Sequence, residues 1–347
     1  MTMAPLAVFR ADAAPDMGGG HVQRCLALGE ALVEAGWRSA FAFRAQTLET
    51  VPALAHSGHR LLPIEGAEEQ EPAFLSSKIG ARCDLLVVDH YGRGSAFEKN
   101  CRAFAARIMA IEDRPGRRHD CDLLLDPTPG RKAADYRNLV PAGCKLLLGP
   151  SYALLRAQFA ETRPAALARR ARREQPARVF VSMGMTDPRN LTAAVLQGIA
   201  ASGTGLAVDL VIGSAAPHLA ALRQLIGTLK LDARVHVDAA DIAGLMAAAD
   251  LAVGAAGSSS FERCCLGLPS LVVVAADNQR DIAAALIQSG AAEVVGEGDL
   301  SHAVADGLKR LCTDAPALVA MAEAAAKLCD GRGAVRVAAE LLTPAQA

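Results

Sequence analysis

The stretch "PLAVFRADAAPDMGGGHVQRCLALGEALVEAGWRSAFAFR" (residues 5–44) decides the fold. Its apolar run at 5–11 predicts a strand, and apolar residues at helical spacing predict a helix over 21–36, closed by Gly36. A second apolar run at 39–44 predicts the next strand. Both runs are continuous rather than alternating, which is typical of parallel strands buried on both faces. The stretch therefore predicts a β-α-β unit of a parallel sheet.

The same alternation continues along the chain in two blocks. The first block adds apolar runs at 84–89, 107–111, 122–126 and 145–149. A polar, basic segment at 163–178 then interrupts the pattern, and we interpret it as an interdomain linker or an exposed helix with solvated charges. The second block has apolar runs at 178–184, 206–213, 234–238, 250–254, 270–274 and 292–296.

Two blocks of this kind predict an α/β fold with two Rossmann-like domains facing across one cleft. We expect an N-terminal domain over 1–162, a C-terminal domain over 175–330, and a helix at 331–347 that can pack back on the first domain. Ligands of such sheets bind at the carboxyl ends of the strands, so the loops that follow strands are the places to search for a site.

Composition excludes several classes of function. The chain has 347 residues and a net charge of −1, which argues against a nucleic-acid partner. No window approaches the roughly twenty apolar residues of a membrane span. The nine cysteines are scattered without CxxC pairs or Cys/His clusters, so we expect reduced thiols, no metal site and a cytoplasmic location. We expect a monomer or a weak dimer.

A glycine run opens the first predicted helix in "DMGGGHVQRC" (16–25). Gly18 and Gly20 let the backbone approach a ligand closely, but the string matches neither the dinucleotide nor the nucleoside-triphosphate fingerprint. His21 follows at the helix start, where a neutral imidazole suits a general base. The alternative is a histidine that only caps or packs the helix. Arg24, one turn later, is a candidate substrate ligand.

Polar residues also follow two later strands of the first block. Asp89, His90 and Tyr91 end one strand, and polar groups gathered at a carboxyl edge indicate a site. They could equally be an ordinary strand-to-loop exit. Glu112 and Asp113 follow the next strand. These two carboxylates could orient a histidine or be solvated turn residues, and spacing does not choose between them.

The second block carries three candidate loops. The loop in "VSMGMTDPRN" offers backbone and polar groups to a diphosphate or sugar at Gly184, Asp187 and Asn190. "GAAGSSSFERC" (254–264) offers serine hydroxyls and backbone N–H groups to phosphate, and a carboxylate to a ribose. Its alternative interpretation is a capping box between Ser259 and Glu262. The loop after the next strand offers Asn278 and Gln279 to sugar hydroxyls.

Together these motifs resemble one family. The chain carries, in order between about residues 6 and 280, "FRADAA", "GGGHVQRCLALGEAL", "VVDHYG", "HDCDLLLD", "LLGPSYALLRAQF", "VSMGMTDPRN" and "AAGSSSFERCCLGLP". The set resembles the nucleotide-sugar hydrolases of pseudaminic acid biosynthesis. That family is similar to GT-B glycosyltransferases, especially the peptidoglycan N-acetylglucosaminyltransferase.

The resemblance implies an inverting hydrolysis that releases UDP from UDP-2,4-diacetamido-2,4,6-trideoxy-β-L-altropyranose without metal or cofactor. It implies that His21 is the general base and that Tyr91 positions sugar or water. The implied UDP-binding positions are Ile242, Gly257, Ser258, Ser259, Ser260 and Glu262. The chain departs from the family pattern at Met185, where a glycine is frequent, and at Phe261, where a tryptophan is common.

Two alternatives stay open at this point. One is a GT-B glycosyltransferase that uses a related UDP-amino-sugar donor and therefore needs an acceptor. The other is a nucleotide-sugar binding protein without catalysis.

Overall fold

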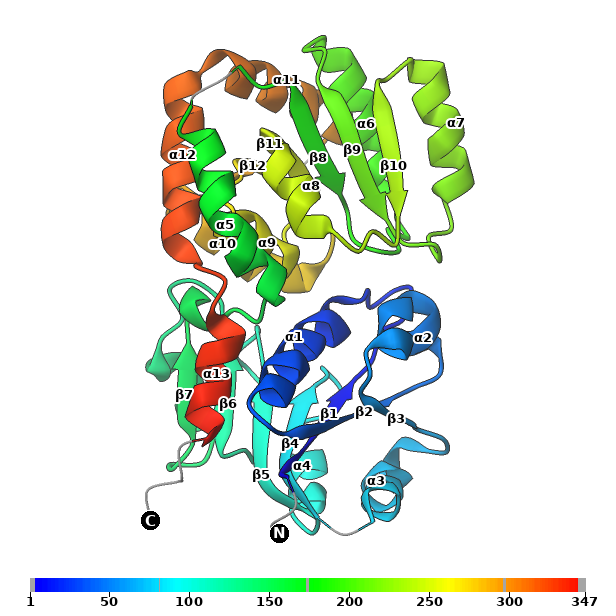
Figure 1. Ribbon diagram of the computed structural model, residues 1–347, viewed down its shortest axis with the longest axis vertical. Coiled ribbons are helices and arrows are strands. Elements are labelled where there is room, and N and C mark those ends of the chain that lie inside the picture. Colours follow the sequence, from blue (N-terminus) through cyan, green and yellow to red (C-terminus); the bar gives the residue numbers. More distant parts are fainter. Residues whose placement is uncertain (1–3, 81, 173–174, 296–297, 343–347) are drawn as a thin grey trace. The chain divides into compact units, whose positions relative to one another are not determined.

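The computed structural model describes residues 4–80, 82–172, 175–295 and 298–342 (Figure 1). The chain divides into two compact units. The first unit consists of Met1–Ala14, Gly19–Arg156 and Arg332–Ala347, and the second of Pro15–Gly18 and Ala157–Gly331. Residues 173–174 of the basic segment, Gly296 of the last predicted strand and 343–347 of the last predicted helix lie outside the described residues.

The first unit is built on a seven-stranded parallel sheet in the order β3-β2-β1-β4-β5-β6-β7. Its strands are β1 Leu6–Ala11, β2 Arg38–Phe43, β3 Arg60–Pro63, β4 Cys83–Asp89, β5 Ala105–Ile111, β6 Leu123–Asp126 and β7 Lys145–Leu148. Its α-helices are α1 Gly20–Glu34, α2 Gln46–Thr50, α3 Glu71–Ile79, α4 Ser95–Cys101 and α13 Gly333–Leu342. The predicted β-α-β start of the chain is confirmed.

The strand order positions the candidate site. β1 and β4 are neighbours although 71 residues separate the end of β1 from the start of β4, and the pairing aligns Ala11 with Asp89. β5 lies on the other side of β4. The loops after β1, β4 and β5 therefore leave the sheet side by side at its carboxyl edge. β1 is buried along its whole length, and this is why its sequence is continuously apolar except for Arg10.

The second unit has a six-stranded parallel sheet in the order β10-β9-β8-β11-β12-β13. Its strands are β8 Arg178–Ser182, β9 Ala207–Ile212, β10 Ala233–Val237, β11 Leu251–Ala255, β12 Ser270–Val273 and β13 Glu293–Val294. Its α-helices are α5 Ala157–Arg170, α6 Leu191–Ser202, α7 Leu219–Leu229, α8 Ile242–Ala248, α9 Ser259–Cys265, α10 Arg280–Gln288, α11 Leu300–Thr313 and α12 Ala315–Leu328. Aliphatic side chains from β8, β9, β11, α6 and α11 form one core.

The first half of the basic segment is a helix, as one of the two interpretations has it, but its arginines bind neighbouring helices rather than water alone. It continues α5, which packs on α8, α9 and α12. Arg163 donates hydrogen bonds to the carbonyls of Ala326 and Cys329, at 2.7 and 3.0 Å. Arg170 donates to the carbonyls of Met246 and Ala249, at 3.0 and 3.3 Å. These arginines satisfy carbonyls at the ends of neighbouring helices, where no intrahelical donor is left.

The helix α13 closes the first unit rather than the second. It packs against α1, and its residues Val337 and Leu341 are buried. Arg107 donates to the carbonyl of Leu341 at 2.7 Å, and Arg336 donates to the carbonyl of Ser151 at 2.9 Å. The second unit is therefore inserted in sequence between two parts of the first.

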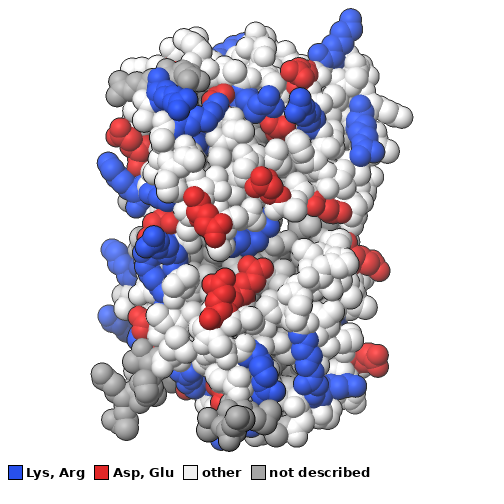
Figure 2. Space-filling model, viewed as in Figure 1, with Lys and Arg blue, Asp and Glu red and all other residues white. Residues whose placement is uncertain are grey.

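Charged side chains of both signs alternate over the face drawn in Figure 2. All nine cysteines are free thiols, and seven of them are buried. Within the described residues, no helix combines the length and the apolar character that crossing a membrane requires.

Candidate active site

The glycine run turns the chain from β1 into α1. Gly18 has φ +76°, a conformation that favours glycine, and Gly19 precedes the first helical residue, Gly20. His21 is thus the second residue of α1, and its side chain is buried, with the residue only 6% exposed. The loop and the helix start are where the sequence predicted them.

Asp89, the last residue of β4, holds both His21 and Arg24. Its Oδ1 lies 2.6 Å from Nδ1 of His21. Arg24 donates to the same carboxylate through Nε and Nη2, both at 2.6 Å. Asp89 and Arg24 are both buried, and the two parallel donations form a bidentate pair. The three side chains form one hydrogen-bonded cluster, the His21 cluster, at the carboxyl edge of the first sheet.

This arrangement fixes which nitrogen of His21 carries a lone pair. Burial alone raises the pKa of Asp89, but the charge of Arg24 and the contacts with His21 outweigh it, so the pKa falls well below its usual range. Asp89 is therefore a carboxylate and accepts a hydrogen bond from Nδ1 of His21. In the neutral ring the lone pair is then on Nε2. Nε2 has no hydrogen-bond partner among the residues that the structure describes.

Tyr91, from the loop after β4, and Asp113, from the loop after β5, extend the His21 cluster. The Tyr91 hydroxyl donates to Asp113 at 2.8 Å, and Arg24 donates to the same carboxylate at 3.2 Å. The ring of Tyr91 meets the ring of His21 edge to face, with centroids 4.9 Å apart. Tyr91 thus contacts His21 directly, while Asp113 accepts hydrogen bonds from both Tyr91 and Arg24.

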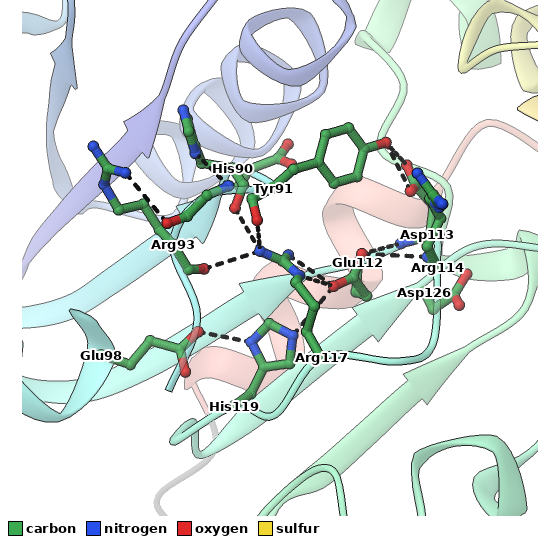
Figure 3. A network of polar contacts seen from close by, with 12 residues as sticks. His90, Tyr91, Arg93, Glu98, Glu112, Asp113, Arg114, Arg117, His119 and Asp126 are labelled. Carbon is green, nitrogen blue, oxygen red and sulfur yellow. Dashed lines mark hydrogen bonds and ion pairs between the residues drawn. The ribbon is translucent and has the colours of Figure 1, made fainter. Parts of the chain in front are cut away.

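A second network of hydrogen bonds and ion pairs, drawn in Figure 3, connects these loops to each other. Arg117 donates to the carbonyl of His90 at 2.9 Å and also to that of Tyr91, and its other nitrogens donate to Glu112 at 2.7 and 2.9 Å. His119 bridges Glu112 and Glu98, at 3.2 and 2.8 Å. Arg117 therefore joins the loop after β4 to the loop after β5.

The charges of this network are mutually stabilised. Burial lowers the pKa of His119, but hydrogen bonds to Glu112 and Glu98 raise it more, to about 9. For Glu112, burial raises the pKa, and His119 and Arg117 lower it to about 2. His119 is therefore an imidazolium at neutral pH between two carboxylates. Glu112 does not orient His21; that role falls to Asp89, and Glu112 holds the loop.

His90 points toward the end of β1 rather than toward His21. Its Nε2 lies 3.3 Å from Asp12, and its Nδ1 accepts the backbone N–H of Gly92 at 2.9 Å. Asp12 also pairs with the fully buried Arg10, at 2.8 Å. His90 therefore links the ends of β1 and β4 next to the His21 cluster.

In the second unit, the loop after β8 prepares α6. Gly184 has φ +104°. The buried Asp187 accepts the backbone N–H groups of Leu191 and Thr192, at 2.9 and 2.8 Å, so it caps the start of α6. Asn190 is the N-cap of α6, and its Oδ1 is buried and finds no hydrogen-bond partner among the residues that the structure describes.

The serine-rich loop, defined here as residues 254–260, runs from the last two residues of β11 to the first two residues of α9. The predicted capping box is not formed: Ser258 is the N-cap of α9 and makes no side-chain cap. Instead, Ser259 and Ser260 accept hydrogen bonds from Arg263, at 3.2 and 2.9 Å. Ser260 is buried, whereas Gly257, Ser258, Ser259 and Glu262 are partly exposed.

The loop after β12 lies beside the serine-rich loop. A Cβ on Gly257 would lie 3.6 Å from Nε2 of Gln279, and Gln279 accepts the backbone N–H of Ala275 at 2.9 Å. Asn278 is partly exposed on the same short turn. Ile242, also partly exposed, is the first residue of α8. Among the described residues, no group of three or more His, Cys, Asp or Glu side chains could hold a metal.

Sequence reasoning missed three residues that the structure makes central. Asp89 was noted only as lining, although it is the partner of His21. Arg117 and Arg263 were not singled out, because single arginines in charged or helical stretches carry no signal of their own. The order of the strands could have indicated Asp89, since the central strands of a doubly wound sheet place the ends of β1 and β4 together.

Comparisons with known proteins agree with this fold. Residues 178–337 match the glycosyltransferase family 28 C-terminal domain. The chain is 28% identical to the spore coat polysaccharide biosynthesis protein SpsG of Bacillus subtilis, over 95% of this chain and 96% of that protein. It is 26% identical to the UDP-2,4-diacetamido-2,4,6-trideoxy-β-L-altropyranose hydrolase of Campylobacter jejuni, over 82% and 96%. The structure of MurG from Acinetobacter baumannii superposes with a TM-score of 0.65 over 97% of this chain and 99% of that one, at 15% identity.

The likeness to MurG shows the fold, which is GT-B-like, as the sequence predicted. The resemblance to the Campylobacter hydrolase that the motifs suggested is also confirmed across most of the chain. The chain is therefore a GT-B-like protein that resembles the UDP-diacetamido-trideoxy-altropyranose hydrolase and whose residues 178–337 match the glycosyltransferase family 28 C-terminal domain.

Proposed function

We propose that the chain acts on a UDP-sugar in sugar biosynthesis. More specifically, we propose that it hydrolyses UDP-2,4-diacetamido-2,4,6-trideoxy-β-L-altropyranose, a step of pseudaminic acid biosynthesis. The name of the Campylobacter relative supports the substrate, and the family 28 domain supports a nucleotide-sugar ligand.

The observation that carries the proposal is the Asp89–His21 pair. Asp89 accepts a hydrogen bond from the Nδ1–H group at 2.6 Å, so Nε2 is left as the basic atom. Nε2 takes a proton from water while the water oxygen bonds to the anomeric carbon. The bond between that carbon and the UDP oxygen breaks at the same time, and its electron pair leaves with UDP. Direct displacement inverts the anomeric centre, and the proton on His21 is later lost to solvent.

Arg24 and Tyr91 complete the roles that we assign in the first unit. Arg24 is held by Asp89 and Asp113, so we assign it to orient Asp89 rather than to bind the sugar. Tyr91 contacts the ring of His21 and has its hydroxyl fixed by Asp113. We assign Tyr91 to positioning the sugar or the attacking water. General-base catalysis of this kind contributes roughly 10²–10⁴ in rate.

We assign the departing UDP to the second unit. The serine-rich loop offers the hydroxyls of Ser258 and Ser259, and Asn278 and Gln279 follow on the neighbouring turn. The carboxylate of Glu262 is assigned to the ribose hydroxyls and Ile242 to the uracil. Hydroxyl and backbone donors suffice for a diphosphate that keeps its phosphoanhydride bond, so the reaction as proposed requires no metal.

The decisive experiment is hydrolysis of the altropyranose donor in ¹⁸O-labelled water. We expect the label in the sugar and none in UDP, with no loss of rate in the presence of a chelator. His21→Asn should bind UDP like the wild type and release UDP at least 100-fold more slowly. Label in UDP, or normal turnover by His21→Asn, would refute the mechanism.

A glycosyltransferase is the second candidate, and the family 28 domain with the MurG-like fold favours it. It predicts that UDP release depends on an added acceptor and that the sugar appears on that acceptor. UDP release at the same rate with water as the only acceptor would exclude it.

A further inference from the structure

Arg263 is a buried cation without a carboxylate. The residue is 1% exposed and lies on α9, behind the serine-rich loop. Its Nη2 donates to the carbonyl of Ala255 and to Ser260, both at 2.9 Å, and its Nη1 donates to Ser259 at 3.2 Å. Its Nε is buried with no partner. Among the described residues, no carboxylate lies within ion-pair distance of Arg263.

The contrast with the first unit is direct. Arg10 and Arg24 are also buried, and each one pairs with carboxylates: Arg10 with Glu71 and Asp12, Arg24 with Asp89 and Asp113. Burying a cation without such a partner is costly. Burial lowers the pKa of Arg263 to about 10, so the guanidinium still carries its charge at neutral pH. An energetic cost of this kind, next to a candidate ligand loop, calls for a compensating anion.

The guanidinium lies at the centre of the second sheet. A Cβ on Gly254 would come within 2.5 Å of Nη1 of Arg263 and within 3.1 Å of the carbonyl oxygen of Ser182. Gly254 of β11 pairs with Ser182 of β8, and the strand order reverses between these two strands. The charge therefore sits at the point of the carboxyl edge where open α/β sheets bind ligands, and Gly254 leaves room for it.

The hydrogen bonds of Arg263 also orient the serines. A hydroxyl that accepts from a guanidinium has its own hydrogen left for another acceptor. Ser259 is partly exposed and accepts only from Arg263 among the described residues. Its hydrogen is therefore free to be donated to a ligand oxygen, and the cation behind it strengthens that donation.

We propose that Arg263 is the positioning residue that makes the serine-rich loop prefer a nucleoside diphosphate to the corresponding neutral nucleoside. It acts through the hydroxyl of Ser259 and through its charge, which forms no ion pair among the described residues, without touching the base or the sugar. The inference rests on the assignment of UDP to the second unit.

The test is equilibrium binding of UDP, uridine and inorganic pyrophosphate by calorimetry. Arg263→Met should weaken UDP and pyrophosphate about 10- to 100-fold, the loss expected for charge-assisted hydrogen bonds, and uridine less than threefold. Arg263→Lys, which keeps the charge, should restore at least part of the lost affinity. Arg170→Met is the control, because Arg170 is a partly buried arginine of the same unit whose hydrogen bonds, among the described residues, go to backbone carbonyls. It should leave all three affinities unchanged.

A merely structural role gives a different result. Equal weakening of UDP and uridine in Arg263→Met, or unchanged UDP affinity in a folded variant, would overturn the inference. If Arg263→Met does not fold, Ser259→Ala supplies the same comparison. This variant should bind UDP at least threefold more weakly than the wild type and bind uridine with unchanged affinity. Equal losses of affinity for both ligands would count against the inference. Wild-type protein that binds UDP but does not hydrolyse the donor would defeat the proposed function and leave the role of Arg263 standing. Wild-type protein that prefers uridine to UDP would defeat the role of Arg263.

Discussion

Replacing Asp89 by Asn separates the two tasks that this carboxylate performs. The amide can still donate a hydrogen bond to Nδ1 of His21, but it then leaves the proton of the neutral ring on Nε2. The nitrogen that should accept a proton from water becomes a donor. We therefore expect kcat for the UDP-sugar to fall by about 10²–10⁴, the range attributed to general-base catalysis, with KM changed less than threefold.

The same change removes the charge that compensates Arg24. Asp89 accepts two donations of 2.6 Å from Arg24, and both residues are buried. Removing one member of a buried pair costs about 3–5 kcal/mol, and Asp113 at 3.2 Å is the remaining partner of Arg24. We expect the lower end, about 3 kcal/mol. With a urea m value of about 2 kcal/mol per M, the midpoint should fall by about 1.5 M.

The two tasks are separated by adding Arg24→Met to Asp89→Asn. The double variant removes the unpaired buried cation, although it also takes one partner from Asp113, so part of the lost stability should return, as it does when a buried pair is replaced by apolar groups. Activity should not return, because the ring still lacks its carboxylate. Recovery of stability and of kcat together would show that Asp89 acts only through folding.

A spectroscopic readout makes the reasoning independent of the substrate. Proteins labelled with ¹⁵N-histidine should show the His21 proton on Nδ1 in the wild type and on Nε2 in Asp89→Asn, with His21→Gln used to assign the signal. A wild-type ring protonated on Nε2, or an Asp89→Asn enzyme within threefold of wild-type kcat, would refute the role of Asp89.

Three further predictions follow from the contacts described above. Tyr91→Phe removes the hydroxyl that donates to Asp113 at 2.8 Å and keeps the ring. We expect kcat to fall about three- to tenfold, which corresponds to the free energy of one hydrogen bond, with little change in thermal stability. A loss of kcat beyond 100-fold would mean that the hydroxyl itself takes part in the chemistry. His119 has a pKa of about 9 in the folded protein against an ordinary value near 6.5, so its charge contributes stability in full below pH 6.5, and this is lost as the pH rises through 9. In the wild type, the free energy of unfolding should therefore fall by about 3 kcal/mol between pH 6.5 and 9, and in His119→Gln this fall should be absent. Urea denaturation at several pH values measures the difference. Identical pH dependence of the unfolding free energy in both proteins would contradict the assignment. Val337→Asp in α13 places a charge on a fully buried position against the first unit and should lower the unfolding free energy by more than about 3 kcal/mol, whereas Val335→Asp, at an exposed position of the same helix, should change it by less than about 0.5 kcal/mol.

The parallel sheets were predictable because strands buried on both faces need uninterrupted apolar residues. β3 was not predicted, since Arg60–Pro63 is a short edge strand with only Leu62 buried, and such a strand leaves no clear pattern. The basic segment was misinterpreted because composition shows that side chains are charged but not what they bind. Arg163 and Arg170 bind backbone carbonyls of distant helices, which local sequence cannot reveal.

The candidate site was predictable in its parts and not in its connections. The glycine loop and strand exits identify His21 and Tyr91 as candidates, but the partner of His21 lies 68 residues away. It becomes visible only when β1 and β4 are known to be neighbours. Asp113 and Glu112 are adjacent in sequence and could not be told apart. Their different tasks arise because one meets Tyr91 and the other meets Arg117 and His119.

The return of α13 to the first unit has a consequence for how the protein is made. On the ribosome, the strands of the first sheet are complete after Leu148, but the helix that covers α1 is synthesised only after the whole second unit. The first unit therefore leaves the ribosome with this face of α1 uncovered, and it stays uncovered until α13 has been synthesised. For the same reason, no single proteolytic cut can liberate an intact first unit.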